Sequence, residues 1–370
     1  MNKKGFTLVE LLAVIAILAI LVIIALPNVL KMFNDSKKNT FLTEAKTIYK
    51  EAANKYISES MKGNRLKFIS SNDNSKLDLN GRDINYCIRV DKTGNVVYMI
   101  VGNGEYAYTY DENKSIEKVT ISDLTDDDYD SEDYSCVIKP KSFSTDNLSI
   151  AIEAIKEGKT ENYKVGDTRE IELKELGKHT IRISNMSTPD ECKQDGFSQS
   201  ACGFVIEFAD ILTTRVMNET KTCDGGWPVT VVRKYLNEKV YNLLPDILKD
   251  SIISTTVVSG YGARDSSNFV SSDKLYLLAS DEIWESSDSI DTAKDKTRQL
   301  DYYKQKGVTS DKNHSAVIKK NSDGKAAGWW TRSIPPKAAN FYFISTIHIG
   351  SSNAVNADIS NGVSPAFRIG

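Results

Sequence analysis

The feature that most constrains this chain is a long apolar run near its N-terminus. From Phe6 to Leu26 the only charged residue is Glu10. A helix of these 21 residues rises about 1.5 Å per residue, so it is long enough to cross a bilayer core of about 30 Å. We therefore expect a membrane segment over residues 6–26. The remainder, rich in Asp, Asn, Ser, Thr and Tyr, is expected to fold outside the bilayer.

The residues that flank this run predict its orientation. Lys3 and Lys4 precede it, so the positive-inside rule keeps residues 1–5 in the cytoplasm and exports the C-terminus. A cleaved secretory signal would have a shorter apolar core and a small-residue site after it, which the segment at 27–29 is not. A plain membrane anchor explains the length but not Glu10, since a carboxylate in a membrane helix is costly and usually has a partner.

The segment KKGFTLVELL at residues 3–12 resembles the class III signal of type IV prepilins. In that family a prepilin peptidase cuts after the glycine and methylates the new N-terminal phenylalanine, and Gly5 and Phe6 stand at those two positions. Glu10 matches the family's glutamate, and Pro27 matches a proline that many members carry within the helix. The resemblance thus implies a leader at residues 1–5 and cleavage between Gly5 and Phe6.

The same resemblance implies partners and a location. The partners are other pilin subunits, the prepilin peptidase, an inner-membrane assembly platform and, before assembly, membrane lipid. The protein would be a single-pass membrane protein first and part of an extracellular pilus at the cell surface afterwards. In a water-poor filament core, the carboxylate of Glu10 and the free amine of a neighbour's Phe6 attract strongly. We therefore expect Glu10 to set the axial register of assembly.

The helical pattern continues beyond the membrane segment. Apolar and aromatic residues at 41, 45, 48, 49, 52 and 56 follow helical spacing, and Lys and Glu residues occupy much of the opposite face. Pro27 is expected to kink or locally open the helix, because it removes one backbone donor. Gly63 and Asn64 predict its end. The pilin helix is therefore expected over residues 6–62, with a globular head docked on its second half.

The head is expected to be a small antiparallel sheet within residues 63–139. Strands separated by Gly- and Asn-containing turns are predicted at 84–90, 95–101, 105–110 and 116–121. A long helix packed on such a sheet is also the architecture that the pilin resemblance implies. Seven carboxylates between Asp123 and Asp133 favour a solvated loop, although binding of Ca²⁺ by hard oxygen ligands stays open.

Five cysteines lie beyond the apolar run, so export would allow them to oxidise, with buried free thiols as the alternative. They are Cys87, Cys136, Cys192, Cys202 and Cys223. A bond between Cys87 and Cys136 would pin the acidic loop to the sheet, and the pilin resemblance favours it because pilins often close a C-terminal loop in this way. Cys192 and Cys202 are further candidates for disulfide formation. The odd count leaves at least one cysteine unpaired or bonded between chains.

A second domain is predicted at residues 165–370, after a polar linker at 140–164 that contains one short helical pattern. Its expected strands and helices follow from apolar runs between turn residues. The strands are predicted at 180–185, 203–208, 274–279, 341–347 and 363–369, with a helix at 228–243, a short helix after Pro245 and an irregular surface loop at 286–314.

Several pieces of this domain resemble an uncharacterised bacterial extracellular family with a C-type-lectin-like fold, related in shape to sulfatase-modifying-factor domains. The pieces are GGW at 225–227, VRKYLN at 232–237, KLYLL at 274–278, WWTRS at 329–333 and GVSPAFRI at 362–369. Thr331 and Ser364 depart from the family's usual Leu and Arg, which leaves the expected fold unchanged. The fold class expected for the whole chain is α+β.

Ligand-binding residues of this domain are expected among its aromatic side chains. Trp329, Trp330 and Tyr342 are candidate contacts to a surface glycan or protein ligand, because aromatic rings suit sugar faces and protein hot spots. For the tryptophan pair, core packing is the competing and favoured interpretation. Arg332 and Arg368 are expected to tie strands together through buried charge pairs.

No catalytic, cofactor or metal site is predicted. His179, His314 and His348 are isolated, and no cysteine follows Cys223, so the reactive cysteine pair of the formylglycine-generating branch is missing. The Ca²⁺-dependent sugar tripeptides of true C-type lectins are also absent. A net charge of −3 gives no basic excess for nucleic acid.

These features predict a type IV pilin, not an enzyme, with an adhesive or partner-binding module. A module of some 200 residues would crowd a subunit repeated at every step, which favours a minor subunit, for example at the filament tip. Two alternatives stay open. One is a pseudopilin of a type II secretion or competence DNA-uptake system, and the other is a membrane-anchored surface receptor that does not polymerise.

Overall fold

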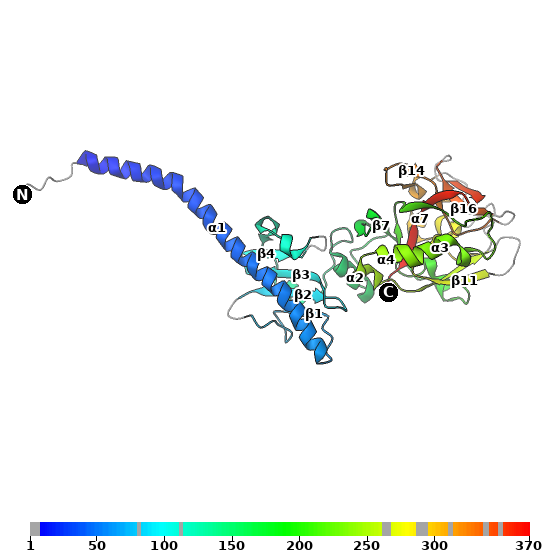
Figure 1. Ribbon diagram of the computed structural model, residues 1–370, viewed down its shortest axis with the longest axis horizontal. Coiled ribbons are helices and arrows are strands. Elements are labelled where there is room, and N and C mark those ends of the chain that lie inside the picture. Colours follow the sequence, from blue (N-terminus) through cyan, green and yellow to red (C-terminus); the bar gives the residue numbers. More distant parts are fainter. Residues whose placement is uncertain are drawn as a thin grey trace, which may run out of the picture. The chain divides into compact units, whose positions relative to one another are not determined.

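The computed structural model, shown in Figure 1, divides the chain into two compact units, Met1–Ile138 and Lys139–Gly370. It describes residues 8–79, 83–110, 114–260, 268–285, 295–309, 314–335, 340–346 and 351–370. One long helix, a set of short helices and several mostly antiparallel sheets form the regular structure of these residues. This content confirms the α+β class.

The first unit is built on the 54-residue helix α1, Leu8–Met61. Pro27 lies inside α1, which stays helical through it, and Figure 1 shows α1 as one bent helix. The helix ends where predicted, because Gly63 takes a positive φ of 84° and its N–H closes the last turn on the Ser60 carbonyl. The expected pilin helix is thus present from Leu8 onward.

Five antiparallel strands form the head sheet in the sequential order β1-β2-β3-β4-β5. Their bounds are β1 Phe68–Ser70, β2 Asn85–Val90, β3 Val96–Gly102, β4 Tyr106–Thr109 and β5 Thr125–Asp126. The meander predicted from the sequence is confirmed for its first three strands, β2 to β4. The short edge strands β1 and β5 were not predicted.

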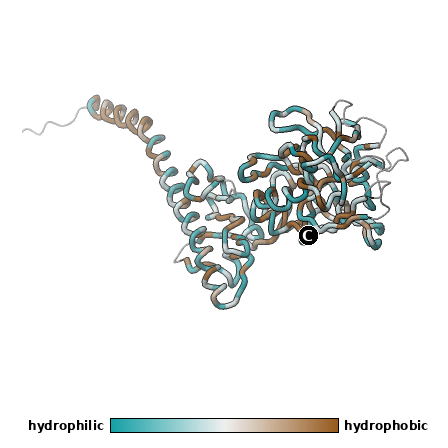
Figure 2. Tube along the Cα trace, turned by 45° about the vertical axis from the view of Figure 1, so that its right-hand side comes forward, coloured by the Kyte–Doolittle hydropathy of each residue, from teal (hydrophilic) through white to brown (hydrophobic). Residues whose placement is uncertain are grey.

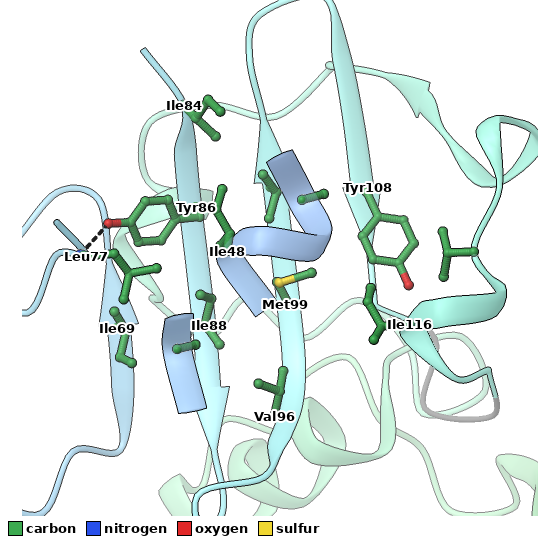
Figure 3. Close-up of a cluster of buried hydrophobic side chains, with 14 of the residues drawn as sticks. Ile48, Ile69, Leu77, Ile84, Tyr86, Ile88, Val96, Met99, Tyr108 and Ile116 are labelled. Carbon is green, nitrogen blue, oxygen red and sulfur yellow. Dashed lines mark hydrogen bonds between the residues drawn. The ribbon is translucent and has the colours of Figure 1, made fainter. Parts of the chain in front are cut away.

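The second half of α1 packs on one face of this sheet. Figure 3 shows Ile48 of α1 close to Ile88 and Met99 of the two central strands, and all three are fully buried. The hydroxyl of Tyr86 accepts a hydrogen bond of 2.6 Å from the backbone N–H of Leu77, which satisfies that polar group within the core. The helical stripe at positions 41–56 is therefore the docking face of the head.

One predicted strand of the head is wrong. Residues 116–121 form parts of two 3₁₀ turns, η1 Ile116–Lys118 and η2 Ile121–Asp123, instead of a strand. The carboxylate of Asp123 accepts the backbone N–H of Thr120 and closes a capping box. Hydrogen bonds from a side chain to the nearby backbone compete with the backbone hydrogen bonds of a strand, which explains why this segment forms turns. A third 3₁₀ turn, η3 Asp133–Ser135, ends the acidic segment.

The predicted linker at 140–164 is also wrong, because this segment packs into the second unit. It contains helix α2, Leu148–Glu157, which Asn147 caps by accepting the backbone N–H of Ser149. The apolar face of α2 is buried, and the buried rings of Phe143 and Tyr163, on either side of α2 in sequence, pack edge to face. Because polar residues surround this narrow apolar stripe in sequence, composition alone suggested a linker.

In the described part of the second unit, the strands form two five-stranded sheets and two hairpins. One sheet has the order β12-β19-β8-β7-β6, and the other has the order β17-β16-β15-β18-β9, with β15 and β18 parallel. The strands are β6 Thr168–Leu173, β7 Gly177–Asn185, β8 Val205–Phe208, β9 Thr213–Val216, β10 Thr255–Gly260, β11 Asn268–Asp273, β12 Tyr276–Leu277, β13 Lys319–Lys320, β14 Ala326–Ala327, β15 Trp329–Trp330, β16 Asn340–Ser345, β17 Ser351–Asn356, β18 Ser360–Val363 and β19 Pro365–Arg368. The C-type-lectin-like fold stays a prediction.

The helices of the second unit are short. They are η4 Asp190–Lys193, η5 Gln199–Ala201, η6 Trp227–Val229, α3 Val231–Tyr235, the π-helical segment η7 Leu236–Val240, α4 Tyr241–Leu243, α5 Asp246–Lys249, α6 Ser280–Ile283, α7 Asp301–Gln305 and η9 Ser315–Val317. The predicted helix at 228–243 is thus a chain of four short segments. The short helix predicted after Pro245 is present as α5.

Two further predictions for this unit need correction. The expected strand at 363–369 is divided at Ser364, so that β18 and β19 belong to different sheets. The expected surface loop at 286–314 lies partly outside the described residues, and its described part includes α7. Leu300 and Tyr303 of this part are fully buried, so apolar anchors hold it against the core.

Candidate functional site

The first half of α1 presents an apolar surface that its own unit leaves uncovered. From Leu8 to Phe33 its large hydrophobic side chains are exposed, and none of its most apolar 18-residue window is buried. Figure 2 shows this stretch as a nearly continuous hydrophobic run along the helix. By length and composition, this helix can cross a membrane. A surface of this kind needs lipid or similar helices around it.

The head covers α1 only beyond this apolar half. Lys37 forms an ion pair with Glu105 at 3.1 Å, and the ammonium of Lys46 donates to the backbone carbonyl of Glu117. Phe41 is the first fully buried residue of the helix, and its ring lies against that of Tyr106. One continuous helix therefore joins an exposed apolar segment to a folded head.

The candidate processing and assembly residues differ in where they lie relative to this segment. Glu10 lies in the first turn of α1 as the structure describes it, where the positive end of the helix dipole favours a carboxylate. Pro27 lies one residue beyond the predicted membrane segment. Gly5 and Phe6 lie outside the described residues.

The acidic segment of the head is held against the sheet. A disulfide joins Cys87 of β2 to Cys136, and the guanidinium of Arg89 donates to the Cys136 carbonyl at 2.6 Å. The hydroxyl of Tyr134 donates to the carboxylate of Asp127, also at 2.6 Å. Among the described residues, no group of His, Cys, Asp or Glu side chains is arranged to hold a metal ion.

A second disulfide closes a short loop in the second unit, residues 139–370, which forms the module. It joins Cys192 to Cys202, which are ten positions apart in sequence. Ser198 and Ser200 within this loop are fully buried, and the backbone N–H of Val258 donates to the Ser198 hydroxyl. Cys223 is buried and forms no disulfide in the described part of the chain.

The candidate ligand contacts are mostly in the core. Trp329 and Trp330 are fully buried, and their indole N–H groups donate to the carbonyls of Val317 and Arg215. As ligand contacts they were therefore wrong, and the competing interpretation of core packing is correct. Tyr342 on β16 is half-buried, so it still offers part of its surface.

A buried charge cluster that was not predicted from the sequence is centred on Glu207 of the module. The carboxylate of Glu207 on β8 accepts hydrogen bonds from Arg182 at 2.8 Å, from Lys319 at 2.7 Å and from the hydroxyl of Tyr303 at 2.9 Å. Burial alone would raise the pKa of Glu207, but the charges of Arg182 and Lys319 outweigh it and lower the pKa to about 2. The sequence contained one indication of this cluster, since Glu207 is the only charged residue in the otherwise apolar strand VIEF.

A second cluster surrounds Arg332, for which a buried charge pair was expected. Its guanidinium donates to both carboxylate oxygens of Glu282 at 2.7 Å and to the hydroxyl of Ser200. Both partners of this ion pair are fully buried. The corresponding expectation for Arg368 was wrong, since it forms no ion pair within the described residues and burial lowers its pKa.

The two histidines that the structure describes have local partners. His179 Nδ1 lies 3.2 Å from the Asp210 carboxylate, and His314 Nδ1 accepts the backbone N–H of Ala316. His348 lies outside the described residues. These contacts assign both imidazoles to the support of local structure.

Two family models match parts of the chain. Residues 205–370 match a domain of unknown function (DUF6273), and residues 1–26 match the prokaryotic N-terminal methylation motif. The chain matches no curated protein and no solved structure significantly. With the exposed apolar half of α1, the N-terminal match identifies a membrane-anchored protein that is type IV pilin-like or pseudopilin-like at its N-terminus.

Proposed function

We propose that this protein is a minor type IV pilin subunit that assembles through α1 and displays the module as an adhesive or partner-binding part. The observation that carries the proposal is the exposed apolar half of α1, continuous with a docked head. Lipid can cover this surface before assembly, and the helices of other pilin subunits can cover it afterwards. Similar helices pack without a preferred axial position, so a charge pair is needed to fix their register.

Glu10 is the group proposed to fix that register, by meeting the free amine of Phe6 on the neighbouring subunit. We expect Glu10→Ala to leave membrane insertion intact and to lower incorporation into sheared filaments by about tenfold or more, because a loss of only 1.4 kcal/mol gives a factor of ten. Glu51→Ala is the matched control, since Glu51 is an exposed residue on the docked half of the same helix. Equal filament yield from both variants would refute the role of Glu10.

The module is proposed to bind a partner and not to catalyse a reaction. Its buried charged residues are used in pairs within the core, as Glu207 with Arg182 and Glu282 with Arg332. Such networks give a rigid scaffold, and binding surfaces are commonly carried by loops on such scaffolds. Its size supports a minor subunit, since the module alone spans more residues than the head and helix together.

A pseudopilin is the second candidate, because the N-terminal methylation motif at residues 1–26 is equally expected there. In that case the module would dock cargo inside a secretion or DNA-uptake machine. A retraction ATPase and other pilins encoded beside this gene support the pilus, and a secretion or uptake operon supports the pseudopilin.

A further inference from the structure

A shallow groove opens where the exposed half of α1 leaves the head. Its volume is about 650 Å³. One face of α1 and the edge of the head sheet formed by β4 and β5 line it. The lining residues are Pro27, Leu30, Lys31, Asn34, Asp35, Lys38, Glu105, Tyr106 and Asp126. The floor is thus apolar at the end nearer the membrane segment and charged at the other end.

The charges in this groove are of both signs and are incompletely paired. Glu105 is neutralised by Lys37. Two cations and two carboxylates remain, and none of them forms an ion pair with another described residue. They are Lys31, Lys38, Asp35 and Asp126. Lys38 lies over the ring of Tyr106 at 5.5 Å, which leaves its N–H donors available. Because these cations and carboxylates do not pair with one another, they are available to a ligand that carries both a positive and a negative charge.

The position of the groove along α1 identifies the source of such a ligand. Exposed apolar side chains continue past Pro27 to Phe33, so the apolar stretch from Leu8 is about 39 Å long at 1.5 Å per residue. This exceeds a hydrocarbon core of about 30 Å, and a tilted helix accommodates the excess. The charged part of the groove then lies in the lipid headgroup layer, where Lys31 can extend its ammonium toward phosphate.

We propose that this groove binds the headgroup of a zwitterionic phospholipid that carries a primary ammonium, in the way that phosphatidylethanolamine does. Lys31 and Lys38 face its phosphate, Asp35 and Asp126 accept hydrogen bonds from its ammonium, and Leu30 contacts the start of an acyl chain. A choline headgroup has no N–H to donate to the carboxylates. An anionic headgroup would leave both carboxylates without a cation.

A bound lipid would hold the head at the membrane surface in the inserted state and would leave the groove when α1 is extracted into a filament. The proposal rests on membrane anchoring by α1, which is part of the proposed function, but it does not require filament assembly. The two can therefore fail separately.

The test uses the full chain reconstituted into vesicles that contain equal amounts of phosphatidylethanolamine and phosphatidylcholine with identical acyl chains. Native mass spectrometry counts the lipids of each kind that the released protein retains. We expect wild type to retain mainly the ethanolamine lipid. Asp35→Asn and Asp126→Asn should each lower this preference by about two- to fivefold, the usual effect of one exposed ion pair. Asp128→Asn, an exposed change outside the groove, should leave it unchanged.

Three results would overturn the proposal. The first is an equal retention of both lipids by wild type. The second is an unchanged lipid ratio in the Asp35 and Asp126 variants. If these variants also show reduced filament incorporation, the groove is assigned to contact between subunits. The third is a failure of wild type to float with vesicles, which would also remove the anchoring function.

Discussion

Replacement of Glu207 by Gln tests whether the buried charge cluster stabilises the module. Glu207 is fully buried, and it compensates the charges of Arg182 and Lys319, whose side chains are largely or fully removed from water. Glutamine keeps the shape of the side chain but removes its negative charge. The variant therefore leaves two cations in the core without their common partner.

Two independent estimates agree on the loss in the free energy of unfolding that Glu207→Gln causes. Removal of one partner from a buried ion pair costs about 3–5 kcal/mol in the free energy of unfolding. The pKa of Glu207 is about 2, compared with an ordinary value of 4.5, and this difference corresponds to about 3 kcal/mol of stabilisation near neutral pH. For a unit of this size, each kcal/mol shifts the melting temperature by about 2–4 °C, so Glu207→Gln should lower it by about 6–20 °C.

Tryptophan fluorescence measures this melting temperature in the full chain, because all four tryptophans lie in the module and are buried. They are Trp227, Trp284, Trp329 and Trp330. Glu175→Gln is the matched control, since Glu175 pairs with Lys239 on the surface, with both side chains more than half exposed. Loss of such a pair changes stability by less than about 1 kcal/mol. Equal melting temperatures for both variants would refute the reasoning.

Three further predictions concern the same units. Because the lowered pKa of Glu207 makes its stabilisation present above pH 4.5 and lost as pH falls toward 2, the stability difference between wild type and Glu207→Gln should shrink from pH 7 to pH 3 in urea titrations. A difference that stays constant would contradict this pKa. Cys87→Ser should destabilise the head by about 4 kcal/mol, and Cys192→Ser should destabilise the module by about 3 kcal/mol. The first effect is larger because the Cys87–Cys136 disulfide closes the longer loop, and thermal unfolding followed by circular dichroism measures both. Trp330→Ala should cost the module about 3–5 kcal/mol through its cavity, and an unchanged melting temperature would place this residue outside the core.

The sequence was most informative where one local pattern decides the structure. The apolar run before Pro27 predicted the exposed half of α1, and the helical stripe that contains Ile48 predicted the docking face of the head. Both depend on a single helix, whose period can be read without knowledge of distant contacts. The turn at Asp91 is equally local, since its carboxylate accepts the N–H groups of Thr93 and Asn95 between β2 and β3.

The module was less predictable, because its elements are short and depend on contacts between distant residues. Lys319 and Glu207 meet across 112 positions, and no window of the sequence contains both. Trp329 and Trp330 are of a residue type that is common on binding surfaces. They lie on β15, the middle strand of its sheet, and are buried, which the sequence alone does not show. Ser364 separates β18 from β19, which belong to different sheets, and no break in the apolar pattern of the sequence marks this division.

The central claim is that the chain is processed and assembled through its N-terminal helix. Its most direct test is mass spectrometry of the mature N-terminus in filaments sheared from producing cells. We predict a chain in the sheared fraction that begins at methylated Phe6. An intact Met1 terminus confined to the membrane fraction would contradict it and would leave a membrane-anchored receptor as the function.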